Sequence, residues 1–147
     1  VLFDQLGYLR IFIWLAIISA FGTDIFAYFV GMALGKHKLC PKISPKKSIE
    51  GSVGGIVGSV ILSGIFTMIF AQNYIMHGCV IGLLGSVVSQ FGDLTASVFK
   101  RKMGIKDYGK LIPGHGGILD RFDSVLFTAP VVYYYVSLVI PAANLPI

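Results

Sequence analysis

The stretch SVGGIVGSVILSGIFTMIFA, Ser52–Ala71, decides the fold, because it carries no charge and is long enough to cross a bilayer as a helix. Three further apolar segments, at about residues 11–34, 75–99 and 124–140, have comparable lengths and lack the alternation of strands. Pro130 lies in the last of them, where a membrane span tolerates a kink. The sequence therefore predicts an all-α integral membrane protein, a bundle of about four transmembrane helices.

The composition supports this class. Of the 147 residues, 55% are hydrophobic and 13% are charged, and the mean hydropathy is +0.80. A soluble domain has roughly a quarter of its residues charged. The length suits one bundle, so we expect a single transmembrane domain over residues 1–147. The first residues show neither a Met nor the basic region of a signal peptide, and we interpret the chain as the C-terminal part of a longer one.

The basic residues gather in two segments that orient the bundle. Five of the twelve Lys and Arg residues lie within 36–47 and six lie within 100–121, after the first and third predicted spans. A four-span bundle places both segments on one side of the membrane, and the positive-inside rule makes them cytoplasmic loops. The basic residues of these two loops account for the net charge of +5. We therefore expect no nucleic-acid binding.

Small residues recur at four-residue spacing in the second span. Gly51, Gly55, Ser59 and Ser63 form this face, and such faces let membrane helices approach closely. The pattern predicts packing, either within the bundle or between subunits, and we expect a homodimer.

Two carboxylates lie inside predicted spans. Asp24 and Asp93 would each cost about 2.5–3.5 kcal/mol at membrane depth, so each is a candidate functional residue, with a paired structural carboxylate as the alternative. On a helix, Asp93, Ser97 and Lys100 share one face, which suits a metal-bound phosphate. The spacing Asp24-x-x-Ala resembles Asp93-x-x-Ala, and we hypothesise that an internal repeat brings both carboxylates to one cavity.

Asp120 and Asp123 also share a helix face, just before the last span. One or two carboxylates, completed by phosphate and water, are the usual protein ligands of Mg²⁺. The segment Pro113–Gly117 upstream supplies backbone N–H groups that can cradle an anion.

The first basic segment offers a second phosphate clamp. Lys46 and Lys47 lie between Ser44 and Ser48, and Glu50 is interpreted as a cap of the next helix. A solvated loop that only orients the protein is the alternative. His37, in the same segment, is interpreted as incidental.

These motifs together resemble one family. The stretches Ser97–Arg101, Lys106–Gly109 and Leu111–Asp123 are similar to the signature of the phosphatidate cytidylyltransferases, also called CDP-diacylglycerol synthases. The earlier elements S-P-K-K-S-x-E-G (44–51) and D-x-x-A-Y-x-x-G (24–31) resemble the same family. Family members carry additional N-terminal spans, which agrees with a partial chain.

The resemblance implies transfer of a cytidylyl group from CTP to phosphatidic acid, with Mg²⁺ required and room for a second cation such as K⁺. It implies a multi-pass protein of the inner (cytoplasmic) membrane, in contact with membrane lipid, whose active site faces the cytoplasm. Asp93 and Asp120 would be metal ligands, with Asp123 and Asp24 as further candidates. The resemblance assigns catalytic roles to Lys100, Arg101, His115, Arg121 and Asp123, and phosphate binding to Ser44, Lys46, Lys47, Ser48, Ser97, Lys106, Gly116 and Gly117.

Other functions remain as alternatives. CTP-dependent polyprenol or phytol kinases share G-D-x-x-A-S and P-K-x-S-x-E-G elements, but the segment H-G-G-x-x-D-R-x-D (115–123) argues against them. CDP-alcohol phosphotransferases are disfavoured because their D-G-x-x-A-R opening is missing. An ion-coupled transporter would use Asp24 and Asp93, but it leaves the basic second loop unexplained.

Overall fold

The computed structural model describes residues 2–105 and 118–140, with the backbone alone at residues 2–6, 8, 9 and 118–121. Its elements follow in the order α1 (Leu2–Leu34), β1 (Lys38–Cys40), β2 (Ser44–Ser48), α2 (Ile49–Phe70), η1 (Gln72–Tyr74), α3 (Ile75–Lys102) and α4 (Ile118–Val139). Each of the four α-helices is long and apolar enough to span a membrane. The predicted all-α membrane bundle is confirmed.

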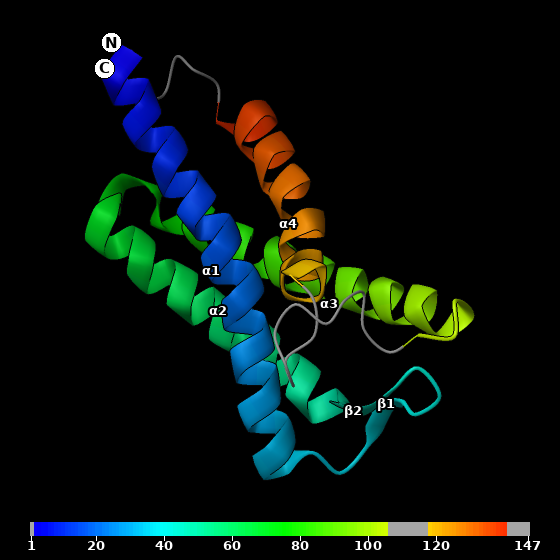
Figure 1. Cartoon of the computed structure of the whole chain (residues 1–147). Helices are drawn as coiled ribbons and strands as arrows, with labels where there is room; N and C mark the ends of the chain where they lie inside the picture. The colour runs from blue at the N-terminus through cyan, green and yellow to red at the C-terminus, as the bar shows by residue number, and fades with distance from the viewer. Residues whose placement is uncertain (1, 106–117, 141–147) are drawn as a thin grey trace.

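The axes of helices α1 and α4 run in similar directions, and α2 and α3 lie across them (Figure 1). Helices α1 and α3 each pack against all three of the other helices. A single 3₁₀ turn, η1, reverses the chain between α2 and α3. Helix α4 continues without interruption through Pro130.

The first basic loop differs from the prediction, because it contains a β-hairpin. Strands β1 and β2 pair antiparallel, with Lys38 opposite Ser48 and Cys40 opposite Ser44. The backbone N–H of Ile43 donates to the carbonyl of Cys40 at 3.2 Å and closes the turn. The strands are short and rich in Lys, Ser and Pro, residues that give little strand signal, so the pattern of apolar residues could not reveal them.

Local chemistry sets the ends of two helices next to this hairpin. Ser48 is the N-cap of α2, and its hydroxyl accepts a hydrogen bond from the N–H of Gly51 at 3.1 Å. Ser48, rather than Glu50, is therefore the N-cap residue, and Glu50 lies in the first turn of α2. At the far end of α3, Gly104 adopts a φ of 72°, which stops the helix after three basic residues in its last turn.

The small residues of α2 pack inside the bundle. A Cβ atom built on Gly51 would lie 2.6 Å from the carbonyl oxygen of Ala27, and one on Gly55 would lie 2.8 Å from that of Thr23. Both contacts are to the backbone of α1, so these glycines set the distance between the two helices. The predicted close packing is confirmed within the bundle, and a homodimer would need a different surface.

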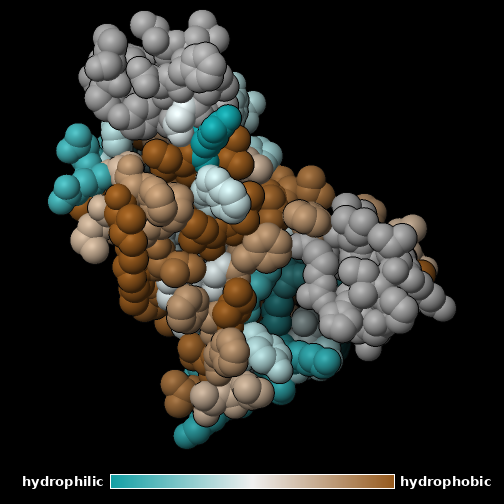
Figure 2. Space-filling model, turned by 60° about the vertical axis from the view of Figure 1, so that its left-hand side comes forward, coloured by the Kyte–Doolittle hydropathy of each residue, from teal (hydrophilic) through white to brown (hydrophobic). Residues whose placement is uncertain are grey.

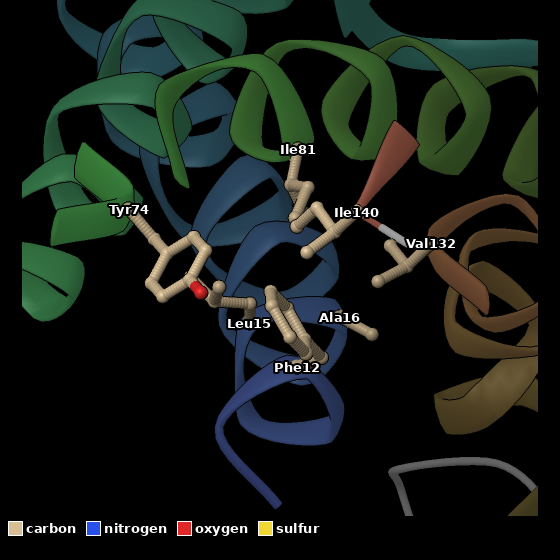
Figure 3. Close-up of a cluster of buried hydrophobic side chains, with 7 residues drawn as sticks. All are labelled: Phe12, Leu15, Ala16, Tyr74, Ile81, Val132 and Ile140. Carbon is tan, nitrogen blue, oxygen red and sulfur yellow. The ribbon is translucent and has the colours of Figure 1, made fainter. Parts of the chain in front are cut away.

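A buried apolar cluster joins the ends of the helices that lie away from the hairpin (Figure 3). Phe12 and Leu15 of α1 meet Tyr74 of η1, Ile81 of α3 and Val132 of α4. Leu15 and Ile81 are almost completely buried. This cluster fixes the helices at one end and leaves the other end for polar groups.

Buried hydroxyl groups connect the helices in the middle of the bundle. The Ser59 hydroxyl of α2 lies 3.1 Å from the carbonyl of Ser19 in α1 and 3.3 Å from that of Gly82 in α3. The Thr128 hydroxyl of α4 lies 3.4 Å from the carbonyl of Gly85 in α3. Such bonds are common between membrane helices, where small polar residues replace bulky ones.

Candidate functional site

The hairpin, α1 and α3 enclose a cavity of about 240 Å³ at one end of the bundle. Figure 2 shows hydrophilic residues gathered in a hollow at the lower end of the molecule, below a mostly hydrophobic surface. The cavity is lined by residues of four elements: Asp24, Ala27, Tyr28, Ser44, Lys46, Lys47, Ser48, Gly51, Ser52, Gln90 and Asp93. Four of the predicted phosphate-binding residues and two of the predicted metal-binding residues thus share one cavity.

A second cavity, of about 270 Å³, adjoins the first. Ser44 and Lys46 line both cavities, and Ser97, Lys100 and Arg101 of α3 complete the second. The last turn of α3 therefore faces the hairpin. This arrangement confirms that the two basic segments, as far as the structure describes them, lie at the same end of the bundle.

Lys47 and Asp93 form an ion pair across the first cavity. The ammonium of Lys47 contacts Oδ2 of Asp93, and both side chains are about a quarter exposed, at 27% and 26%. Lys47 lies in strand β2, whereas Asp93 lies in the C-terminal half of α3, so the pair ties the hairpin to a membrane helix.

Two more carboxylates approach Asp93 from α1 and α4. The Ser124 hydroxyl lies 3.2 Å from Oδ2 of Asp24 and 3.3 Å from Oδ1 of Asp123, so it can donate to either carboxylate. The N–H of Ser124 also donates to Oδ1 of Asp123 at 2.7 Å. Asp93 is near enough to repel the negative charge of both carboxylates.

The predicted convergence of Asp24 and Asp93 is therefore confirmed, because both line one cavity. The internal repeat that suggested this convergence stays a hypothesis. Three carboxylates brought together need a compensating positive charge, since like charges are costly at membrane depth. Lys47 supplies part of this charge, and a cation is suited to supply more.

The carboxylates fit a magnesium ion whose remaining ligands come from water or substrate. Within the described residues, no group of three or more His, Cys, Asp or Glu side chains is placed to hold a metal ion by itself. Magnesium commonly binds one or two protein carboxylates and takes its remaining ligands from phosphate and water. Asp93 and Asp24 offer such hard oxygen atoms, with Asp123 next to them.

Several predicted residues lie outside the described part of the chain. Lys106, His115, Gly116 and Gly117 belong to the segment between α3 and α4, and their positions are not described. Asp120 and Arg121 lie in the first turns of α4, where the backbone alone is described. Their roles stay predictions.

The structure adds residues that sequence reasoning did not select. Gln90, one turn before Asp93, lines the cavity and donates through Nε2 to the carbonyl of Ser52 at 2.9 Å. Ser124 joins two carboxylates, and its position directly after Asp123 was the available signal. Ser48 lines the cavity as predicted, but its hydroxyl also caps α2.

His37 is not incidental to the local structure. Its ring nitrogen Nδ1 lies 2.7 Å from Oε1 of Glu50, and its backbone N–H donates to the same carboxylate at 3.2 Å. The N–H of Ile49 donates to the carbonyl of His37 at 3.0 Å. These contacts close the base of the hairpin and so position Lys46 and Lys47.

The chain is similar to known proteins over most of its length. A family model described as the cytidylyltransferase family matches residues 3–139. A phosphatidate cytidylyltransferase of Bacillus subtilis is 48% identical over 137 residues, which are 92% of this chain and 50% of that protein. One of Synechocystis is 61% identical over 67 residues, 46% of this chain and 23% of that protein.

A third relative, a phosphatidate cytidylyltransferase of Brucella abortus, is 40% identical over 132 residues, 90% of this chain and 48% of that protein. The chain thus spans half the length, or less, of these curated relatives. The family model covers nearly all of the sequence, including α1, the hairpin and α3, which carry the cavity. The chain belongs to the cytidylyltransferase family.

Proposed function

We propose that the protein containing this chain transfers the cytidylyl group of CTP to phosphatidic acid and releases pyrophosphate. The observation that carries the proposal is the cavity in which hairpin lysines face the carboxylates of α1 and α3. The relatives named phosphatidate cytidylyltransferase support it. Because the chain spans only part of those relatives, the proposal concerns the complete protein.

In the proposed reaction, a phosphate oxygen of phosphatidic acid attacks the α-phosphorus of CTP. A new P–O bond forms, the bond between the α-phosphorus and its bridging oxygen breaks, and pyrophosphate leaves with the electron pair. The attacking oxygen is already anionic at neutral pH, so the site needs no strong base. Catalysis then rests on positioning the two phosphates and on neutralising the charge of the leaving group.

The side chains around the two cavities suit this task. Lys46 and Lys47 would bind phosphate from the hairpin, and Lys100 and Arg101 would do so from α3. The hydroxyls of Ser44 and Ser97 add hydrogen-bond donors beside them. These groups lie at the junction of two elements, where a nucleotide and a lipid headgroup can meet.

We further propose that Asp93 and Asp120 hold Mg²⁺, with Asp24 and Asp123 as nearby carboxylates. When bound, Mg²⁺ withdraws negative charge from the phosphates of the nucleotide. The carboxylates of this chain fix its position, and Ser124 fixes the orientation of two of them. A second cation such as K⁺ stays a prediction of the resemblance.

The proposed orientation places the two cavities on the cytoplasmic side of the inner membrane. The support is the gathering of Lys46, Lys47, Lys100 and Arg101 at one end of the bundle, together with the positive-inside rule. CTP is a soluble nucleotide and phosphatidic acid is a lipid, so the site belongs at the membrane surface. We also retain the homodimer as a proposal.

The test is the fate of two radioactive labels with the complete gene product in phosphatidic acid micelles and Mg²⁺. Label from the α-phosphate of CTP should enter the lipid, and label from the γ-phosphate should leave as pyrophosphate. The Asp93→Asn variant should lose this transfer, whereas Thr95→Ala, at an exposed position of the same helix, should keep it. Transfer of γ-label to an isoprenoid alcohol, without lipid-linked cytidylate, would overturn the proposal.

A further inference from the structure

The ion pair between Lys47 and Asp93 occupies a carboxylate oxygen that the proposed function also needs. The ammonium contacts Oδ2 of Asp93 inside the first cavity, and about three quarters of each side chain is buried. Lys47 also attracts the negative charge of Asp24. Lys47 therefore acts as the counter-ion of the carboxylates. A metal ion bound in the first cavity would have the same role.

An ammonium and a divalent cation cannot share this carboxylate oxygen at close range without repelling each other. The Coulomb energy between the two positive charges grows as their separation falls and as water is excluded. The two cations thus compete for Asp93. The competition is relieved when Lys47 moves to another anionic partner.

The geometry of the hairpin allows such an exchange. The backbone of Lys47 is fixed, because Ser48 caps α2 and because His37 and Glu50 close the hairpin base. The ammonium stands at the end of a flexible four-carbon stem and can reorient without moving this backbone. Lys46 and Ser44 line the same cavity, so a phosphate bound there would lie close to Lys47.

We propose that Lys47 and the metal ion are alternative partners of Asp93, and that Lys47 transfers from Asp93 to a nucleotide phosphate when nucleotide and metal bind together. The inference rests on the proposed function, because it assumes a metal and a nucleotide in this cavity. Its consequence is cooperative binding. The nucleotide raises the affinity for the metal, and by linkage the metal raises the affinity for the nucleotide by the same factor.

The test measures metal binding rather than catalysis. Mn²⁺ serves as a paramagnetic probe, and free Mn²⁺ is followed by electron paramagnetic resonance with the complete gene product, with and without the unreactive α,β-methylene analogue of CTP. For the parent protein, once the Mn²⁺ that the analogue binds in protein-free solution is subtracted, we expect weak binding of Mn²⁺ alone and tighter binding with the analogue. For Lys47→Met we expect Mn²⁺ alone to bind about tenfold more tightly than to the parent, with the effect of the analogue reduced by the same factor.

Three further variants sharpen the result. Lys46→Met removes one positive charge from the neighbouring position of the hairpin and controls for the general electrostatic effect. Lys47→Arg keeps the charge and should keep the weak binding of Mn²⁺ alone. Lys47→Gln should change the affinity in the same direction as Lys47→Met, and circular dichroism of each variant checks that the helices are retained.

Different failures have different meanings. If Lys47→Met and Lys47→Gln bind Mn²⁺ alone no more tightly than the parent, or if Lys46→Met gives the same gain, the inference is overturned and the proposed function stands. If the parent binds no Mn²⁺ even with the analogue, both the inference and the proposed metal site fail. The α-label experiment would then still decide whether cytidylyl transfer occurs.

Discussion

The two ends of the helix bundle are held together by different kinds of contact. At one end Phe12, Leu15 and Ile81 make an apolar cluster without charged groups among its members. At the other end Lys47 and Asp93 form an ion pair beside further carboxylates and lysines. The same helices α1 and α3 contribute to both ends. A single helix can therefore contribute apolar packing contacts in one half and polar residues of the candidate site in the other.

The difference matters because the lipid around the bundle is as apolar as the cluster. Helix association in a membrane gains little from removing apolar surface from water, and close packing supplies more of the free energy. Polar groups at membrane depth follow the opposite rule, since each needs a partner. We therefore expect substitutions at the apolar end to lower stability and substitutions at the polar end to lower activity.

Among the variants that test this comparison, Asp24→Asn has the largest expected effect, and it acts on activity. This change removes the negative charge of the side chain that accepts a hydrogen bond from Ser124, while it keeps the size of that side chain. We expect cytidylyl transfer to fall about 100-fold, comparable to losing one group that stabilises the transition state. The thermal midpoint should change little. Activity close to that of the parent would show that Asp24 only packs near the site.

The comparison predicts the reverse for Leu15→Ala. Leu15 is fully buried in the apolar cluster, and its truncation leaves a cavity that lipid cannot fill. We expect the free energy of unfolding to fall by about 2–3 kcal/mol, measured by denaturation in detergent micelles. Ile13→Ala, on the same helix but 53% exposed, is the control. Equal losses from both variants would contradict the role of the cluster.

Gly55→Ala tests the contact between α1 and α2, which lies between the two ends. The added methyl group would meet the carbonyl oxygen of Thr23 at 2.8 Å, and a backbone atom cannot move away cheaply. We expect a loss of about 1–2 kcal/mol, because the better helix propensity of alanine offsets part of the overpacking. In Gly64→Ala the new atom meets the Cys79 side chain at 3.1 Å. This control should be closer to the parent in thermal stability.

The smallest expected effect concerns the hairpin base. Glu50→Gln keeps the shape of the side chain but removes the charge that faces His37, an exposed pair that water screens. We expect the KM for CTP to rise about threefold with an unchanged kcat, because the hairpin carries Lys46 and Lys47. Hydrogen exchange of residues 38–48 should become faster. An unchanged exchange rate would show that the strand pairing alone holds the hairpin.

Much of this architecture could be predicted because the signals are local. Each span is a long apolar run, so the four helices follow from length and composition. The shared cavity of Asp24 and Asp93 followed from their unusual depth and from one repeated spacing. A carboxylate in an apolar run is conspicuous, and its functional interpretation needs no knowledge of the fold.

The rest depends on contacts between residues distant in sequence. The hairpin was missed because its strands are short and polar, and its partners His37 and Glu50 are brought together by the turn. Lys47 and Asp93 are 46 positions apart in the sequence. No pattern within β2 or α3 indicates that these two residues pair. Long-range polar contacts of this kind leave no periodicity in the sequence.

The hydrogen bond between Ser124 and Asp24 has a consequence for biosynthesis. The two residues are 100 positions apart, so the ribosome delivers Asp24 to the membrane long before its hydroxyl partner exists. A lone carboxylate at membrane depth costs about 2.5–3.5 kcal/mol. Lys46 and Lys47, the basic residues that line the same cavity, are synthesised well before Ser124. The polar end is completed only when α4 is inserted, so a nascent chain stopped before α4 would hold helices α1 to α3 but would lack the hydroxyl partner of Asp24.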